Sequence, residues 1–336
     1  MGKPAVVASL ALWAAAGLAL AAPAGPRSTG QHRDQPDGML VLAVNPPERA
    51  VVADPRTGAT STRRLAGGTL CHGPLLAVGD RVILSGSRRG RPVALSLPLT
   101  LRGHARSLGP ADTFTGSPTP GRLWLGRRTT GGVGAPPISL REANPDGRVV
   151  ARTSEVLPSW GGLEAVTDDG FLSTGRRGLT LRRPFERGQR SFRDGWLIAA
   201  GRTRFAWCRG DCRRLRLWSR GGGRTLDPPA GLRPFPGGRA AISADGRVLA
   251  VPVQTRHGTR VGVIDLASDT WSVVPGAKIA GYWSIAWSPS GRWLYFTGAK
   301  RLFAWQPGSA RPRRLPIRLG GTVMSIATVQ GPRRPR

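Results

Sequence analysis

Apolar stretches alternate with short polar turns along most of this chain, and the clearest example occurs twice. Residues 242–251 (ISADGRVLAV) return 45 residues later as residues 287–296 (WSPSGRWLYF). Each copy has an apolar residue, a Ser-x-Asp/Ser-Gly-Arg turn and an apolar run rich in β-formers, which predicts a two-stranded hairpin. A hairpin that recurs at a period of this size is typical of a repeating β-architecture.

The same alternation extends on both sides of the two copies. Four strands are predicted in each of the two clearest units, at 240–243, 248–253, 261–266 and 270–274, and at 284–287, 293–297, 302–305 and 313–317. Weaker units precede them at 39–65, 75–97, 121–152, 163–174 and 196–219. No stretch after residue 38 shows sustained helical periodicity. Units of four strands in about 40 residues have the size of propeller blades.

The number and size of the units predict how many blades the ring contains. About seven units of about 42 residues fit between Gly38 and Val329, which predicts an all-β chain with a single β-propeller of seven four-stranded blades. Six or eight blades also fit the weaker units. Thr322–Val329 is left over as one strand at the end. We expect it to pair into the first blade and close the ring, because closure removes exposed sheet edges.

Both ends of the chain differ in composition from this region. Lys3, the apolar run at 5–20 and small residues at 19–24 predict a signal peptide over 1–24. The alternative is a membrane anchor, but the run is shorter than the ~20 residues that a span needs. Residues 25–37 are expected to be a flexible spacer, 38–329 the propeller domain and 330–336 a disordered basic tail. The protein is therefore expected to be secreted or extracytoplasmic, at the cell envelope, without a transmembrane anchor after cleavage.

Two segments carry a resemblance to known propellers. Residues 288–296 (SPSGRWLYF) resemble the Ser-Pro-Asp-Gly-Arg/Lys repeat of TolB-like and WD-repeat-like propellers, and residues 263–266 resemble the strand that follows it. The match covers residues 239–317. Ser290 stands where those families usually have Asp, and the Gly-His…Trp-Asp pair of strict WD repeats does not occur. The resemblance implies the fold but no activity, because propellers host many unrelated functions.

The charge of the chain is strongly positive. Lys and Arg number 50 against 19 Asp and Glu, for a formal net charge of +31, and nearly all of the basic residues are Arg. One interpretation is a surface for polyanions. The other is coding bias in a GC-rich, actinobacteria-like genome. Basic residues spread as pairs, such as Arg63-Arg64 and Arg313-Arg314, favour the second. Non-specific affinity for polyanions is still expected at low salt.

The cysteines predict one disulfide. Cys208 and Cys212 flank Arg-Gly-Asp between two predicted strands, and in an exported chain such a pair is expected to be oxidised. A redox or metal site is the alternative, but it needs further soft ligands. The enclosed tripeptide also resembles an adhesion motif, although Arg and turn residues are so common here that chance explains it better.

The pair Cys71-His72 suggests a nucleophile and base, yet neighbours on a strand point to opposite faces. A free, buried Cys71 is therefore preferred.

Candidate catalytic chemistry is sparse. Beyond His32 in the spacer, the histidines are His72, His104 and His257. We find no Gly-x-Ser-x-Gly elbow, phosphate loop or calcium-loop spacing. The prominent acids occupy predicted turns, where Asp stabilises the backbone: Asp168, Asp169, Asp245, Asp265 and Asp269. The sequence therefore predicts no catalytic residue, no metal site and no cofactor.

Tryptophan is the remaining candidate for recognition. Most tryptophans are expected to pack between blades. Trp160, Trp196 and Trp283 adjoin Gly-rich loops and are candidate exposed aromatics for a glycan or a peptide. The leading prediction is a monomeric, non-enzymatic binding or scaffold module with a protein or glycan partner at the cell envelope. The alternatives are a propeller lyase or hydrolase acting on a sugar or peptide, and a polyanion-binding protein that uses its Arg excess.

Overall fold

The structure is a computed structural model. It describes residues 35–65, 75–128, 138–157, 162–175, 178–183, 189–235, 240–279, 284–298 and 301–330. The chain divides into two units, Met1–Gln35 and Pro36–Arg336, and all described residues except Gln35 belong to the second. All of the strands belong to the second unit.

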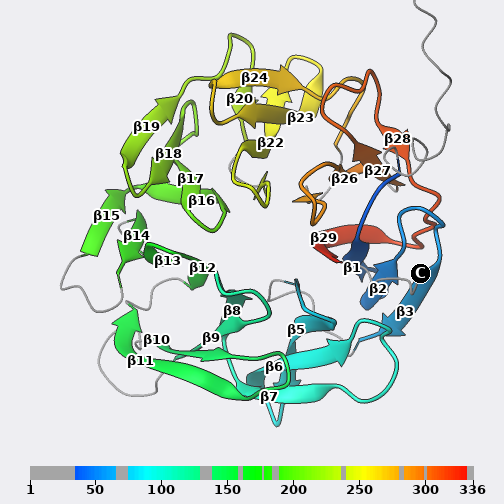
Figure 1. Ribbon diagram of the computed structural model, residues 1–336, viewed down its shortest axis with the longest axis vertical. Helices are drawn as coiled ribbons and strands as arrows, with labels where there is room; N and C mark the ends of the chain where they lie inside the picture. Colours follow the sequence, from blue (N-terminus) through cyan, green and yellow to red (C-terminus); the bar gives the residue numbers. More distant parts are fainter. Residues whose placement is uncertain are drawn as a thin grey trace, which may run out of the picture. The chain divides into compact units, whose positions relative to one another are not determined.

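The described residues form seven antiparallel sheets that surround a common centre as the blades of a propeller (Figure 1). This confirms the predicted fold class and blade number, and it excludes six or eight blades. Among the described residues, no helix is long and apolar enough to cross a membrane.

The blades are numbered along the chain, with their strands given from the centre outward (Figure 1). Blade 1 contains β29 (Thr322–Val329), β1 (Met39–Asn45), β2 (Arg49–Ala53) and β3 (Thr60–Arg64). Blade 2 contains β4 (Leu76–Val78), β5 (Arg81–Arg88), β6 (Arg91–Pro98) and β7 (Arg106–Pro110). Blade 3 contains β8 (Thr113–Gly116), β9 (Leu123–Arg128), β10 (Ile138–Ala143) and β11 (Val149–Leu157). Blade 4 contains β12 (Leu163–Thr167), β13 (Gly170–Gly175), β14 (Gly178–Arg182) and β15 (Gln189–Arg193).

The remaining blades follow the same order. Blade 5 contains β16 (Gly195–Ala200), β17 (Arg204–Arg209), β18 (Leu215–Ser219) and β19 (Gly222–Leu226). Blade 6 contains β20 (Arg233–Pro234), β21 (Ala241–Ile242), β22 (Val248–Thr255), β23 (Gly258–Asp265) and β24 (Thr270–Val273). Blade 7 contains β25 (Ile285–Trp287), β26 (Leu294–Gly298), β27 (Arg301–Trp305) and β28 (Arg313–Arg314).

The C-terminal strand closes the ring, as predicted. β29 pairs with β1 from Met39↔Val329 to Asn45↔Thr322 and is the inner strand of blade 1. It also fastens blade 1 to blade 7, because the Ile326 amide donates to Ser284 Oγ at 2.7 Å and Thr328 Oγ1 donates to a blade 7 carbonyl at 2.6 Å. Ring closure therefore rests on backbone pairing and on hydrogen bonds to a second blade.

Apolar side chains are buried mainly between neighbouring blades. Leu217 of blade 5 and Leu249 of blade 6 belong to one buried cluster. Phe192 of blade 4 lies against Phe205 and Trp207 of blade 5, with ring centroids 5.6 and 4.8 Å apart. Because the apolar face of one blade is covered by the next, each sheet depends on its neighbours for burial.

The two repeated sequence segments form the same turn in blades 6 and 7. In each, the first serine (Ser243 or Ser288) accepts a hydrogen bond from the amide five residues on, at 2.9 and 3.1 Å. The turn glycine has a φ of 72° in both copies, which favours glycine. Asp245 accepts from an amide two residues on, and Ser290 does the same at the equivalent position. A serine can therefore replace the usual aspartate in this turn.

The structure differs from the predicted strands mainly at the innermost and outermost strands of the blades. The inner strand of blade 6, expected at 240–243, is made by two short pieces, since β20 and β21 both pair with β22. The outer strand expected at 313–317 is only Arg313–Arg314, where Pro312 and Pro316 on either side lack the amide that a ladder needs. The outer strands β7, β15 and β19, the inner strand β8 and the third strand of blade 4, β14, were not predicted at all. An outer strand such as β19 (GGRTL) is mostly exposed and shows no apolar alternation.

The predicted disulfide is present. Cys208 is buried next to the last residue of β17, Cys212 lies across the tight turn to β18, and their Cα atoms are 5.0 Å apart. The other cysteine, Cys71, and its neighbour His72 lie outside the described residues.

Removing this disulfide should destabilise the protein moderately. We expect a Cys208→Ala/Cys212→Ala variant to lose about 2 kcal/mol in the free energy of unfolding, because the closed loop is short and constrains the unfolded chain little. Urea denaturation with and without a reductant measures the effect. The reductant should shift the wild-type midpoint toward that of the variant and leave the variant unchanged. If the urea midpoint of the wild type does not shift when reductant is added, the prediction is wrong.

Candidate functional site

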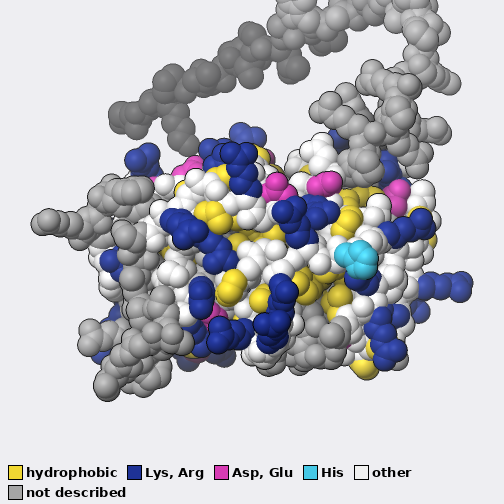
Figure 2. Space-filling model, turned by 90° about the horizontal axis from the view of Figure 1, so that it is seen from below, with side chains coloured by type: hydrophobic (Ala, Val, Ile, Leu, Met, Phe, Trp, Pro, Cys, Tyr) yellow, Lys and Arg dark blue, Asp and Glu magenta, His cyan; other side chains and the backbone are white. Residues whose placement is uncertain are grey.

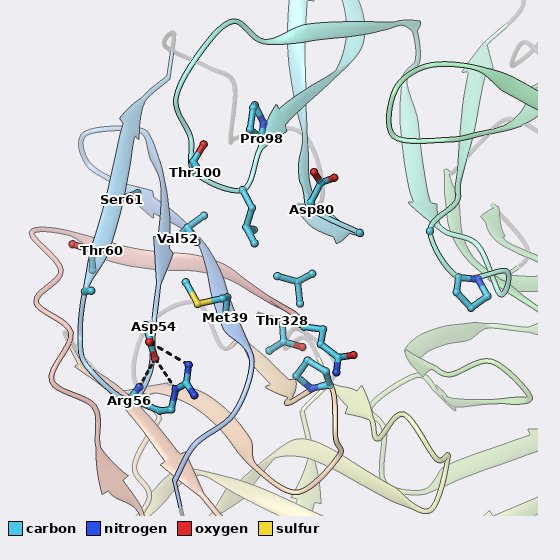
Figure 3. Close-up of a pocket in the computed structure, with 18 residues that line it drawn as sticks. Met39, Val52, Asp54, Arg56, Thr60, Ser61, Asp80, Pro98, Thr100 and Thr328 are labelled. Carbon is cyan, nitrogen blue, oxygen red and sulfur yellow. Dashed lines mark hydrogen bonds and ion pairs between the residues drawn. The ribbon is translucent and has the colours of Figure 1, made fainter. Parts of the chain in front are cut away.

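A cavity of about 960 Å³ opens at one face of the ring. It is lined by the β2–β3 turn of blade 1, the β4–β5 and β6–β7 turns of blade 2, and residues from turns of blades 3 and 7. Figure 3 shows its labelled residues, which come from separate strands and turns. The cavity is therefore built by blades that lie far apart in the sequence.

The paired ends of β1 and β29 form one side of the cavity. Met39 and Val329 are register partners, and both line it. Gly38 has a φ of 80°, and a Cβ there would lie 2.6 Å from Pro289 Cδ. The glycine therefore allows β1 to begin in close contact with the blade 7 turn. Just before it, Pro36 is buried and the Asp37 carbonyl accepts a hydrogen bond from the buried Tyr295 hydroxyl at 2.6 Å.

Two acidic side chains reach the cavity although the chain as a whole is strongly basic. Burial raises the pKa of Asp54, but hydrogen bonds from the backbone and guanidinium of Arg56 outweigh it and hold this pKa below its usual value. The Arg56 amide and Nε lie 2.9 and 3.2 Å from Asp54 Oδ1. Asp80, in the β4–β5 turn, is exposed. Asp54 is thus held as a carboxylate by Arg56, and Asp80 adds a second acid.

The rest of the lining combines apolar and hydroxyl side chains. Apolar groups come from blades 1, 2 and 7, as Met39, Val52, Pro98, Leu99 and Pro289, and hydroxyls come from Thr60, Ser61, Thr100 and Thr328. A concave site with apolar walls and a few polar groups is the usual form of a binding site for an organic ligand or a chain segment. No sequence pattern pointed to this site, because its residues converge only through the ring.

Of the three candidate aromatics, the structure describes Trp196 alone. It lies in the inner strand β16, is 55% exposed and pairs in register with Cys208. Trp160 and Trp283 lie outside the described residues. His104 and His257 are exposed in turns of blades 2 and 6. No group of three or more His, Cys, Asp or Glu side chains that could hold a metal ion occurs among the described residues.

The acid of the Arg-Gly-Asp tripeptide has intramolecular partners. A hydrogen bond from the Arg213 guanidinium, at 2.6 Å, lowers the pKa of Asp211, and Arg233 adds a second favourable charge at 3.3 Å. Arg233 comes from blade 6, so Asp211 links blade 5 to its neighbour. This role supports the interpretation of the tripeptide as a turn that resembles an adhesion motif by chance.

Several arginines also connect blades. Arg202 of blade 5 pairs with Asp168 of blade 4 at 3.0 Å, and Arg224 of blade 5 pairs with Asp269 of blade 6 at 2.9 Å. Figure 2 shows one side of the molecule, where basic side chains form separate groups with acidic side chains between some of them. Part of the Arg excess therefore contributes to contacts within the ring.

The comparisons with known proteins identify the fold. TolB of Acinetobacter baumannii is 15% identical with a TM-score of 0.50, and the match covers 86% of this chain and 66% of TolB. AztD of Citrobacter koseri is 13% identical with a TM-score of 0.53, covering 89% of this chain and 100% of that one. The periplasmic gluconolactonase PpgL of Pseudomonas aeruginosa is 14% identical with a TM-score of 0.52, covering 88% and 99%. No protein-family model and no curated protein sequence matches the chain.

These likenesses define the class of protein. The chain has the seven-bladed propeller fold of TolB-like structures, as the repeated turn predicted. At identities of 13–15%, the likeness extends to the fold alone.

Proposed function

We propose that this protein is a non-enzymatic binding module at the cell envelope, and that a partner protein inserts a segment into the cavity between blades 1 and 2. The observation that supports this proposal most directly is the cavity. Its volume, about 960 Å³, is at the upper end of the range for small-molecule sites, and it leaves room for several residues of a chain.

The lining also suits a polypeptide segment. Apolar walls provide burial, while the threonine hydroxyls and the two acids offer hydrogen bonds to amide groups. Most of the lining lies in turns and strand ends of rigid blades, so little conformational entropy is lost on binding.

The proposed location rests on the N-terminal sequence. Residues 1–24 have the pattern of a secretory signal peptide. The Cys208–Cys212 disulfide agrees with an oxidising compartment. One of the structurally similar proteins, PpgL, is itself periplasmic.

Blocking the cavity should abolish capture of the partner. Ala59, in the β2–β3 turn, lines the cavity and is exposed, so Ala59→Trp should place a large side chain in it without disturbing the core. We expect the tagged mature chain to retain a discrete protein from an envelope extract after low-salt and then high-salt washes, and the variant to lose it. The measurement is a pull-down followed by mass spectrometry.

Ala267→Trp is the matched control. Ala267 is an exposed alanine in the β23–β24 turn of blade 6, which corresponds to the β2–β3 turn of blade 1, and it does not line the cavity. This variant should capture the same protein as the wild type. Equal capture by Ala59→Trp would refute the cavity as the site. Recovery only of polyanions that leave with salt would instead favour the polyanion-binding alternative.

A further inference from the structure

A second feature lies at the opposite face of the ring from the cavity. In each blade, successive turns alternate between the two faces because the strands are antiparallel. The cavity involves turns such as β4–β5 and β6–β7, which join the first strand of a blade to its second and the third to its fourth. Trp196 lies at the start of β16, level with the β17–β18 turn that joins the second and third strands of blade 5. Trp196 and the cavity are therefore separate sites.

Trp196 is the one exposed tryptophan among the described residues. Apart from it, the exposed large apolar residues in this part of the chain are two valines of β11, Val149 and Val150. Trp207 and Trp218 in the same blade are 5% exposed. Because Trp196 is so exposed, its side chain adds less to the stability of the fold through burial than Trp207 and Trp218 do. Its place in an inner strand leaves its ring accessible next to the centre of the propeller.

The backbone around Trp196 is held rigidly. The Cys208–Cys212 disulfide closes the adjacent turn, and the Gly210 amide donates to the Asp194 carbonyl at 3.4 Å. Arg233 of blade 6 donates to the Asp211 carbonyl at 3.0 Å. The turn is thus fixed by a covalent bond, by the chain just before Trp196 and by the next blade. An aromatic side chain on a fixed backbone loses little conformational entropy on binding.

Charged side chains in neighbouring ion pairs surround this region. Exposed pairs are formed by Arg193 with Asp194, by Arg213 with Asp211 and by Arg214 with Asp227, at 3.8, 2.6 and 3.1 Å. Each pair presents donors and acceptors side by side, and because Asp211 is shared by Arg213 and Arg233 the region carries more positive than negative charge. Side-by-side donors and acceptors suit a ligand whose groups both donate and accept hydrogen bonds, which is the property of sugar hydroxyls.

We propose that Trp196 is the stacking platform of a saccharide-binding site at this face. The C–H groups of a pyranose ring lie against the electron-rich indole face, and ring hydroxyls bond the Arg213–Asp211 pair and its neighbours. Trp196 supplies contact area, and the disulfide-closed turn holds the polar groups in place.

The test uses the mature chain with defined oligosaccharides. The probes are chitotetraose and cellotetraose as neutral ligands and trigalacturonate as an acidic one, measured by calorimetry and by acrylamide quenching of tryptophan fluorescence. We expect a member of the panel to bind with millimolar or tighter affinity, and to protect from quenching the part of the fluorescence that Trp196→Ala removes. Trp196→Ala should weaken that binding about tenfold or more, while Trp196→Tyr retains most of it.

Two further variants make the outcome specific. Ala59→Trp, which blocks the cavity, should leave saccharide binding unchanged, so failure of the partner proposal and failure of this one are distinguishable. The Cys208→Ala/Cys212→Ala variant should bind more weakly than the wild type in the absence of denaturant. No binding of any panel member at about 10 mM would overturn the proposal. Binding of trigalacturonate alone that disappears with salt and survives Trp196→Ala would also overturn it.

Discussion

A chain that ends at Gly321 should fail to form the folded propeller. Without β29, blade 1 loses its inner strand and β1 becomes an open edge along the whole register from Met39 to Asn45. Val323 and Ile326 also leave a buried cluster that includes Tyr295 of blade 7. Because the ring then lacks both the backbone pairing and the contact between its ends, we expect no cooperative unfolding transition and strong aggregation.

Calorimetry and size-exclusion chromatography of the truncated chain measure this effect. A chain that ends at Gln330 is the control, and it should unfold like the full-length protein because it retains all of β29. A synthetic peptide of residues 322–329 should partly restore a folded species when added to the shorter chain. If the chain ending at Gly321 melts within a few degrees of the control, β29 is not needed for closure.

The second large effect is expected at Gly178, at the start of β14. Its φ is +107°, and a Cβ there would lie 2.5 Å from Phe192 O and 2.6 Å from the amides of Asp194 and Gly195. All three neighbours are backbone atoms, so no side-chain rotation relieves the contact. Gly178→Ala should therefore displace the connection from blade 4 to blade 5 and lower the free energy of unfolding by about 4 kcal/mol or more.

Gly258 provides a matched control for this variant. It has a nearly equal φ of +100°, but no atom lies within 4 Å of the position of its Cβ. Gly258→Ala should lose only the backbone strain, about 1–3 kcal/mol. Urea denaturation of both variants separates the steric contact from the strain. Similar losses for the two variants would show that the Gly178 neighbourhood adjusts without cost.

The two binding proposals predict independent behaviour at the two faces. Ala59→Trp should affect only capture of the partner protein, and Trp196→Ala only the binding of saccharide. The polar groups near the two sites also differ. The cavity holds Asp54 and Asp80 with Arg56, whereas in the turn beside Trp196 one acid, Asp211, is shared by Arg213 and Arg233. A protein with both activities would connect a protein partner to a glycan through one rigid ring.

Much of the fold was predictable because its signals are local. The turn that begins at Ser243 and returns at Ser288 depends on hydrogen bonds within six residues, so its sequence pattern survives in both copies. Thr322–Val329 was predictable as a closing strand because it stands alone after the last complete blade. The outer strands were harder to predict. β15 and β19 are largely exposed, and pairing with the strand beside them, rather than their own apolar pattern, makes them strands.

The sequence by itself determined the class of the fold, ring closure and the Cys208–Cys212 bond, since each depends on periodicity or on close spacing along the chain. It favoured seven blades, but the structure was needed to exclude six and eight. Only the tertiary structure decided where the candidate sites lie. The cavity joins residues of blades 1, 2, 3 and 7 that are up to about 290 residues apart, and no local pattern records that convergence. The exposure of Trp196 was likewise decided by the ring, because the same residue type in Trp207 is buried by a neighbouring blade.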